Sequence, residues 1–402
     1  MGSQSTADII AVLDSVSHGS FHGDEVERLR VRAAARRLLA RVESPYERAW
    51  GFCFEHPVVF AAIQTCIDLG LWKAWTAAGG GEKTLDELTK LTTSEIELNL
   101  LRRLFRLLAT FNVVEETGLD TFKPTPFSFA IGDEATKVRA SLEAATNQYL
   151  LAGHNLPKYL AKTGYKEPTA ADVNNYTESD PDGLNFFGRL QKTPKYYSDF
   201  VGHMESWTAW KTPWTKIYDP AKLLEGANLD SSPLVVDVGG NTGIDISHVL
   251  KALGPDDLPQ GALVLQDLPE IIVRAKKLVD NSKITAMAHD FFEPQPVKGS
   301  RAYFMHAVLH DWPDNRATLL LQNTRDAMVK GYSKLFVYDI VLPPTGASIS
   351  QATMDVNMMA LLSAAERTKA QWESLLTGAG FKIVKFWADP QEYEMLIEAE
   401  IA

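Results

Sequence analysis

Two hydrophobic patterns follow each other along the chain. Up to about residue 215 the apolar residues recur at helical spacing, whereas beyond it short apolar runs alternate with helical stretches. Alternating strands and helices predict a parallel sheet with helices on both faces. The last two runs are close in sequence, so we expect them to pair antiparallel at the sheet edge. The seven expected strands are 234–238, 262–265, 284–287, 302–306, 334–340, 382–386 and 394–398.

The first 45 residues, 1–45, are predicted to form a helical arm. Apolar residues recur at roughly helical spacing in 24–41, with arginines between them. The arginines could face an acidic partner, but a solvated helix face explains them more simply.

Residues 46–125 have the outline of a winged helix. Their pattern predicts a buried helix at 55–75, a capping box that starts at Thr84, a second helix at 95–109 and a hairpin across Gly118. The second helix would be the one that reads DNA, and its charge is mixed. This favours packing against a second subunit over DNA binding.

Residues 126–215 are predicted to be helical, and they are rich in aromatic residues. Dense aromatic residues are more often core, but beside a cofactor domain they could wall a flat apolar pocket. The remaining residues, 216–402, would hold the sheet. The predicted fold is therefore α/β, with a Rossmann-like sheet preceded by an all-helical winged-helix domain. The candidates for the pocket wall are Phe187, Met204 and Trp207.

Composition narrows the range of functions. The chain has 402 residues, 45% of them hydrophobic, and a formal net charge of −11. This charge argues against nucleic acid or an anionic membrane as the main partner. Cys53 and Cys66 are the only cysteines, and no apolar run approaches the length of a membrane span. We therefore expect a protein of a reducing compartment, located in the cytoplasm.

The stretch from Leu234 to Gly243 is the first candidate ligand site. A strand-length apolar run ends in Asp237, and a turn with Gly239 and Gly240 leads into a helix. By itself this could be a tight turn between packed elements. In a nucleotide-binding sheet the same arrangement brings the backbone close to the ligand.

Acidic residues at the next two strand ends favour the nucleotide interpretation. Asp267 ends the second strand, where a ribose would offer its hydroxyls, and Asp290 with Phe291 follows the third, where an adenine could bind. No lysine or arginine flanks the glycine turn and no G-x-G-x-x-G occurs, so a pyrophosphate is disfavoured. An acid beside the turn suits a cation such as S-adenosylmethionine.

His310 is the candidate for proton transfer. It follows the fourth strand and should therefore lie at the ligand-binding edge of the sheet. A histidine bonded only to its neighbour Asp311 would be an ordinary loop feature. Asp339, after the fifth strand, and Glu366, before the next helix, could orient the imidazole and stabilise its protonated form.

Over nearly its whole length the sequence resembles the S-adenosylmethionine-dependent O-methyltransferases of the caffeic-acid type, especially their fungal natural-product members. The resemblance rests on D-V-G-G-N-T-G from Asp237, L-Q-D-L-P from Leu265, H-D-F-F from His289, L-H-D-W-P-D from Leu309 and A-E-R-T from Ala365. Each motif alone is of moderate specificity, and their order makes the set strong.

The resemblance implies a class I methyltransferase sheet, S-adenosylmethionine as cofactor and a homodimer formed through the N-terminal domain. It implies no metal: His310 is the general base, flanked by Asp339 and Glu366. The implied cofactor contacts are Asp237, Gly239, Gly240, Gly243, Asp267, Leu268, Asp290, Phe291 and His306. The implied acceptor contacts are Asp311, Met358, Met359 and Leu362, beside the aromatic candidates above.

Two positions depart from the family pattern. Asn241 replaces the glycine at the centre of the turn, and asparagine tolerates left-handed backbone better than most residues. His306 stands where plant members carry a lysine, which removes a fixed positive charge near the cofactor. We therefore expect an intact turn and a cofactor site that is less positive.

The expected reaction is methylation of a phenolic or polyketide-like hydroxyl, with neutral His310 accepting the proton during in-line attack. An alternative is a non-methylating enzyme of the same fold that keeps the cofactor as an electrostatic element in a dehydration or pericyclic rearrangement. A third is a DNA-binding regulator that uses the winged helix. The identity of the acceptor is not encoded in a readable motif.

Overall fold

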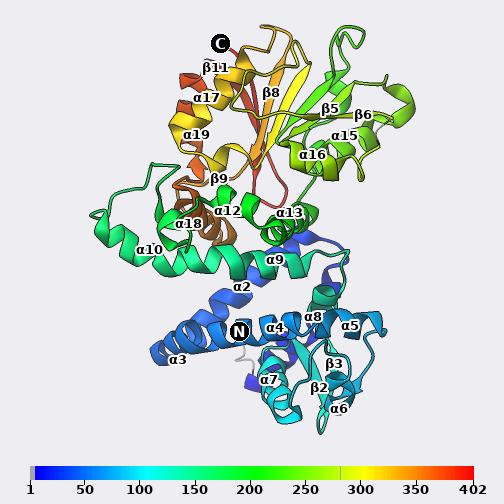
Figure 1. The fold of residues 1–402 in the computed structure, drawn as a ribbon, viewed down its shortest axis with the longest axis vertical. Coiled ribbons are helices and arrows are strands. Elements are labelled where there is room, and N and C mark those ends of the chain that lie inside the picture. Colours follow the sequence, from blue (N-terminus) through cyan, green and yellow to red (C-terminus); the bar gives the residue numbers. More distant parts are fainter. Residues whose placement is uncertain (1–4, 281) are drawn as a thin grey trace.

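The molecule has three tiers along its longest axis. The computed structural model describes residues 5–280 and 282–402. The sheet and its covering helices form one end, a layer of helices lies in the middle, and the N-terminal helices form the other end (Figure 1).

The sheet has seven strands in the order β11-β12-β8-β7-β4-β5-β6. Five strands are parallel, and β12 pairs antiparallel with both β8 and β11, which confirms the predicted edge. The short strands β9 (Val341–Leu342) and β10 (Arg367–Thr368) form a separate parallel pair. The seven strands are β4 (Val235–Val238), β5 (Leu263–Asp267), β6 (Ile284–Ala288), β7 (Ala302–His306), β8 (Lys334–Asp339), β11 (Phe381–Ala388) and β12 (Met395–Ile401).

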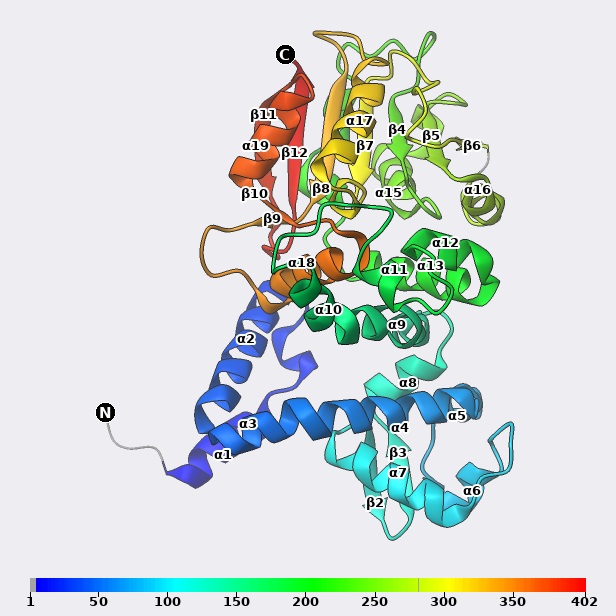
Figure 2. The same ribbon diagram turned by 60° about the vertical axis from the view of Figure 1, so that its left-hand side comes forward.

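Helices cover both faces of the sheet, as the strand pattern predicted. On one face, α17 (Asp314–Arg325) and α19 (Lys369–Gly378) bury Leu320 and Trp372. On the other, α14 (Trp214–Ile217), α15 (Ile244–Leu253) and α16 (Pro269–Ala275) bury their apolar residues. These helices cover the faces of the sheet but not its edge, so the carboxyl ends of the parallel strands face the middle tier (Figures 1 and 2).

The middle tier consists of helices, several of which lie against α18 (Ile349–Leu362), which returns from the sheet domain (Figure 2). Phe186, Leu190 and Tyr176 pack against Met358 and Leu361 of α18. The tier therefore forms a lid-like layer over the strand ends. Its members are α9 (Val138–Ala144), a π-helix (Ala145–Tyr149), α10 (Leu150–Lys162), α11 (Asn175–Ser179), α12 (Phe186–Lys192) and α13 (Pro194–Ala209). The helix α8 (Pro126–Gly132), expected in this segment, instead buries Ile131 in the core of the N-terminal tier.

The N-terminal tier differs from the expectation in three places. The predicted helix at 55–75 is two helices, because Gly70 adopts a left-handed φ of 66° between them. The helix predicted at 95–109 begins at Leu98. The tier is also not all-helical, since β1 joins the predicted hairpin in the order β1-β3-β2. The elements are α3 (Pro45–Trp50), a π-helix (Gly51–Glu55), α4 (His56–Asp68), α5 (Leu71–Ala77), β1 (Lys83–Thr84), α6 (Leu85–Thr89), α7 (Leu98–Thr110), β2 (Val114–Gly118) and β3 (Thr121–Pro124).

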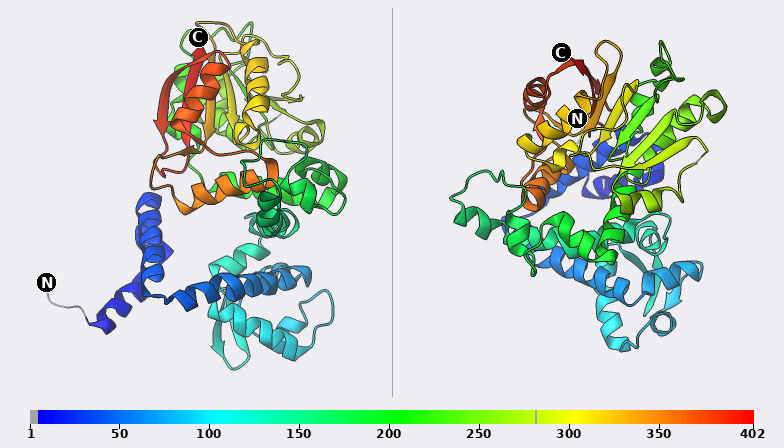
Figure 3. Two further views of the ribbon diagram at one scale, coloured as in Figure 1. Left: turned by 90° about the vertical axis from the view of Figure 1, so that its left-hand side faces the viewer. Right: turned by 45° about the horizontal axis from the view of Figure 1, so that its top comes forward.

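The N-terminal arm runs beside the rest of the chain (Figure 2). It consists of α1 (Thr6–Ser15), a short 3-10 turn (His18–Phe21) and α2 (Glu25–Val42), and none of these elements has a buried residue within the described chain. Figure 3 shows α2 standing beside the body without lying on it. Arg28 pairs with Glu25 within the helix, and Arg30 pairs with Glu27, in agreement with a solvated face.

Within the described residues, no single helix has both the length and the apolar composition needed to cross a membrane. One bent pair, Pro45–Asp68 with Leu71–Ala77 at 63°, satisfies the two requirements together.

Candidate active site

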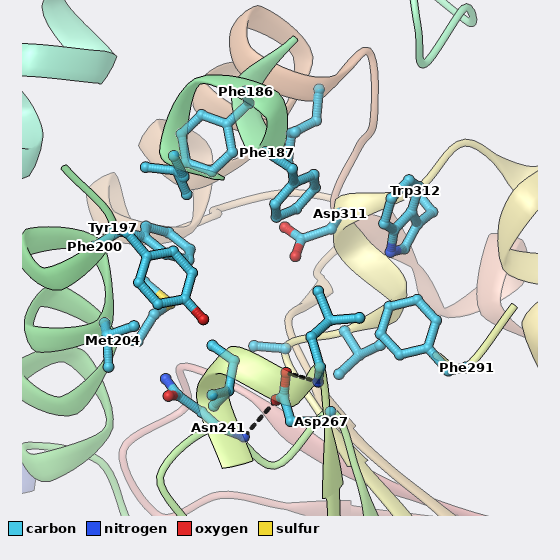
Figure 4. Close-up of a pocket in the computed structure, with 18 of the residues that line it drawn as sticks. Phe186, Phe187, Tyr197, Phe200, Met204, Asn241, Asp267, Phe291, Asp311 and Trp312 are labelled. Carbon is cyan, nitrogen blue, oxygen red and sulfur yellow. Dashed lines mark hydrogen bonds between the residues drawn. The ribbon is translucent and has the colours of Figure 1, made fainter. Parts of the chain in front are cut away.

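A cavity of about 600 Å³ lies between the carboxyl ends of the parallel strands and the middle tier (Figure 4). Its floor comes from the glycine turn and the ends of β5 and β7, and its roof comes from aromatic residues of α12 and α13. Of the expected site residues, the cavity wall includes Phe187, Met204, Trp207, Gly239, Gly240, Asp267, Leu268, Asp290, Phe291, His306, Asp311 and Leu362.

The glycine turn brings backbone to the cavity because side chains do not fit there. A Cβ at Gly239 would lie 2.9 Å from Val308 Cγ2, and one at Gly240 would lie 2.5 Å from the Asp237 carboxyl group. Asn241 holds a left-handed φ of 52°, so asparagine keeps the turn as expected. Gly243 caps α15 outside the cavity wall.

Asp237 lies beneath this turn, and the hydrogen-bonding capacity of its carboxylate is unused. Its side chain is buried, and neither carboxylate oxygen has a hydrogen-bond partner among the described residues. Burial, reinforced by the nearby Asp245 carboxylate, raises its pKa well above the usual range. A cation bound at the turn would relieve both effects.

Asp267 is held in place by the backbone. Its carboxylate accepts hydrogen bonds from the Asn241 N–H at 2.8 Å and the Leu268 N–H at 2.7 Å, both visible in Figure 4. Burial raises its pKa to about 6. Each carboxylate oxygen retains a lone pair, so the group can still accept hydrogen bonds from two ligand hydroxyls.

His306 belongs to a buried charge network that the sequence patterns did not reveal. Its Nδ1 lies 2.7 Å from Asp245 Oδ2, and its Nε2 lies 3.3 Å from Lys211 Nζ and 3.4 Å from Glu394 Oε2. Lys211 also pairs with Glu394 and lies over the Trp207 ring. No motif marked Lys211, Glu394 or Asp245 in the sequence.

This network corrects the expectation of a less positive site. Burial lowers the pKa of His306, but Asp245 and Glu394 outweigh burial and raise it to about 9. The imidazole is therefore a cation at neutral pH, and it restores the charge that a lysine would carry. Lys211 adds a second cation, although burial lowers its pKa to about 8.

His310 lies in a cluster of carboxylates, as the sequence predicted. Its Nδ1 is 2.8 Å from Glu366 Oε1 and 3.6 Å from Asp339 Oδ1, and its Nε2 is 3.5 Å from Asp311 Oδ1. The Trp207 ring is stacked against the imidazole, with centroids 6.2 Å apart. His310 itself is 5% exposed, and Asp311 is the cluster member that lines the cavity.

The environment of His310 contradicts the expectation of a neutral imidazole at neutral pH. Burial lowers its pKa, but Glu366, Asp339 and Asp311 outweigh burial and raise it to about 10. The sequence indicated which acids could contact His310. It does not show that three carboxylates pack around one buried imidazole and together raise its pKa. His310, Asp339 and Glu366 also hold ligand atoms within 4.8 Å of one another, a spacing that a metal ion could use.

The expectation for α18 was partly wrong. Leu362 lines the cavity, but Met359 is not part of the cavity wall and Met358 is packed in the core with Tyr176 and Phe186. The helix instead presents Met354 and Asn357 to a second cavity of about 1080 Å³. A continuous apolar run does not specify which face of a helix meets the core. The sequence of α18 therefore did not show which of its residues line a cavity.

The second cavity adjoins the first. Tyr149 lines it, and the Tyr149 ring meets Phe186 of the first cavity edge-on, with centroids 6.5 Å apart. Consecutive residues of α13 face the two spaces: His203 lines the second cavity and Met204 the first. The two cavities therefore share a wall made of these side chains.

Comparisons with known proteins agree with this geometry. Residues 209–382 match the model of an O-methyltransferase domain. The chain is 44% identical over 397 residues to the O-methyltransferase ATR12 of Stachybotrys chlorohalonatus, and the alignment covers 99% of each chain.

Two solved structures share the fold. A structure of LepI in complex with SAM has a TM-score of 0.90 and 24% identity, and the match covers 99% of this chain and 100% of that one. A structure described as a pericyclic reaction enzyme has a TM-score of 0.89 and 23% identity, with the same coverage. At these identities the similarity establishes the architecture alone.

Proposed function

Because the chain belongs to the fungal O-methyltransferases of secondary metabolism, enzymes that depend on S-adenosylmethionine, we propose that it methylates a hydroxyl of a phenolic or polyketide-like small molecule. The observation that carries this proposal is that one cavity is lined both by the expected cofactor-binding residues and by a member of the acid–base cluster around His310. The glycine turn and Asp267 line this cavity, and so does Asp311 of the His310 cluster. The proposed location of the enzyme is the cytoplasm, on the grounds of composition.

The residues at the turn fit S-adenosylmethionine. Asp237 offers unpartnered carboxylate oxygens near the place where an ammonium would lie, and Asp267 retains lone pairs for ribose hydroxyls. Phe291 gives an apolar face beside Asp290, as an adenine requires. The acidic wall suits a ligand that is cationic at both its ammonium and its sulfonium.

The role proposed for His310 is that of general base. S-adenosylmethionine, when bound, supplies the methyl group as an electrophile. The acceptor hydroxyl approaches Asp311, which orients it, and the Nε2 edge of His310 takes the proton. Glu366 and Asp339 stabilise the resulting imidazolium from the Nδ1 side. The raised pKa of His310, about 10, is close to that of a phenol, about 10, so this proton transfer is nearly balanced in free energy.

The same pKa predicts a distinctive pH dependence. Only the neutral imidazole can accept a proton, so kcat/KM should rise with pH from neutrality towards about 10, where the cluster holds the pKa of His310. Glu366→Gln removes a group that raises this pKa, so the rising limb should move to lower pH. Initial rates between pH 6 and 10.5, roughly the span of the two relevant pKa values, would measure the shift. An unchanged limb in the variant would contradict the assignment.

Transfer assays separate methylation from the alternative of a non-methylating enzyme. We expect calorimetry to detect binding of S-adenosylhomocysteine, and labelled-methyl transfer to occur on members of a phenol panel. Pretreatment with EDTA should leave the rate unchanged, because the proposal assigns the His310 cluster to proton transfer and requires no metal. Cofactor binding with product formation but no consumption of S-adenosylmethionine would support a dehydratase or pericyclase instead. Loss of rate with EDTA would indicate a metal at His310, Asp339 and Glu366.

We also propose a homodimer formed through the N-terminal tier. Its surface exposes large apolar residues, among them Tyr46 at 70% and Phe52 at 65%, and the arm buries none of its residues within the described chain. Apolar area of this kind is typical of a subunit interface. Light scattering should give twice the 44.5-kDa chain mass, and Phe52→Asp should shift the population towards monomer. A monomeric wild-type protein at micromolar concentration would contradict this.

A further inference from the structure

Both apolar and polar side chains line the second cavity. Leu150, Leu151 and Met354 supply apolar surface, while Ser141, Tyr149 and His203 supply hydrogen-bonding groups. These polar residues come from α9, the π-helix Ala145–Tyr149 and α13. A π-helix turn is uncommon and is often found at functional sites, so its place in this wall is consistent with a binding role.

His203 is held in one orientation by its neighbours. Its Nδ1 lies 3.1 Å from Ser141 Oγ, and the Tyr149 ring meets the imidazole edge-on, with centroids 5.7 Å apart. Since the hydroxyl of Ser141 can donate to Nδ1, the Nε2 atom can carry the proton and act as a donor. Burial, with a further contribution from Lys211, lowers the pKa of His203 to about 4, so the ring is neutral at physiological pH.

Tyr149 adds a second neutral donor next to the reaction centre. Burial and the nearby Asp311 carboxylate raise the pKa of its phenol, which therefore stays protonated. Asp311 lines the first cavity and Tyr149 lines the second, so Tyr149 lies in the wall between the two.

The charges at this cavity do not favour an ionic ligand. Glu178 lies in its wall, and its carboxylate is paired with Lys162 at 2.8 Å. Among the described lining residues there is no lysine or arginine that could pair with a ligand carboxylate. Moving an unpaired carboxylate out of water is costly, whereas a carbonyl oxygen needs only hydrogen-bond donors.

We propose that the second cavity holds the part of the acceptor distal to the methylated hydroxyl, and that His203, oriented by Ser141 and assisted by Tyr149, selects a neutral carbonyl-type oxygen there. The inference rests on the proposed methyl transfer and narrows its substrate class to flat acceptors that carry such an oxygen away from the reacting hydroxyl.

Three naphthols that differ in one group test the proposal. At the same position of the ring distal to the hydroxyl they carry an acetyl, an ethyl or a carboxylate group. Their binding would be followed by naphthol fluorescence with S-adenosylhomocysteine present, so that the result does not depend on turnover. We expect the acetyl compound to bind about tenfold more tightly than the ethyl compound, the effect of one good hydrogen bond, and the carboxylate to bind most weakly. His203→Phe removes this hydrogen bond, so the variant should bind the acetyl and ethyl compounds with about equal affinity. Its affinities for the ethyl compound and for the cofactor should stay those of wild type.

Ser141→Ala should give part of the same loss, because it frees the imidazole without removing it. Ser206→Ala is the matched control, since Ser206 lies on α13 outside both cavity walls. An unchanged acetyl preference in His203→Phe, or equal wild-type binding of the three compounds, would overturn the proposal. If the predicted binding pattern is found but no naphthol is methylated, the methyl-transfer assignment fails while the specificity assignment stands.

Discussion

Replacing His310 with alanine is expected to lower kcat by about 10²–10⁴-fold, the usual contribution of a general base. The imidazole is the only group of its cluster whose neutral form can take a proton of phenol strength, because the carboxylates around it are much weaker bases. Binding of S-adenosylhomocysteine should persist, since His310 lies outside the wall that holds the cofactor residues. Single-turnover methyl transfer and calorimetry would measure the two effects separately.

Chemical rescue provides the control for this prediction. His310→Gly leaves a space bounded by Glu366, Asp339 and Trp207, and added imidazole could occupy it. Recovery of turnover in proportion to free imidazole would identify proton transfer as the lost function. Because the variant leaves buried carboxylates without their partner, its thermal stability must be compared with that of wild type. Turnover at the wild-type rate in His310→Ala would exclude this residue as the base.

His310 also links catalysis to stability. Its pKa in the folded chain is raised to about 10 from a usual value of about 6.5. Its ionic contribution to stability is therefore fully present below about pH 6.5 and is lost as the pH rises towards 10. The rate should rise over the same interval in which this contribution declines.

The sheet could be predicted because its signal is local. Four of the five parallel strands are buried on both faces and therefore read as largely apolar runs, as in Val235–Val238 and Leu263–Asp267, whereas β6 is only partly buried. The acids at the strand ends were equally visible, since parallel strands place their carboxyl ends on one edge. Asp267 and Asp311 consequently lie in the cavity, as expected from the sequence.

The features that were missed depend on contacts between distant segments. Lys211 and Glu394 are 183 positions apart, and their pairing beside His306 has no local pattern. The protonation of His306 and His310 depends on how many carboxylates surround a buried ring, which spacing along the chain does not report. The break at Gly70 shows another limit: a single glycine within an apolar run is compatible with either one helix or two.

Asp267→Ala is expected to weaken cofactor binding by about 10²–10⁴-fold. In the proposed complex its carboxylate accepts two hydrogen bonds from ribose hydroxyls, and bonds to a charged group contribute about 1.5–3 kcal/mol each. The carboxylate is already positioned by the Asn241 and Leu268 N–H groups, so little ordering is required when the ligand binds. Calorimetric titration with S-adenosylhomocysteine would measure the loss.

Two further variants separate the ribose contacts from support of the glycine turn. Asp267→Asn keeps an oxygen that can accept the Asn241 N–H but removes the charge, so it should bind the cofactor with intermediate affinity. Glu293→Gln changes an acid in the same domain that lies outside the cavity wall, and its affinity should match that of wild type. If Asp267→Asn bound as weakly as the alanine variant, the negative charge itself would be the requirement. Wild-type affinity in Asp267→Ala would place the ribose elsewhere and would contradict the assignment of the β5 strand end.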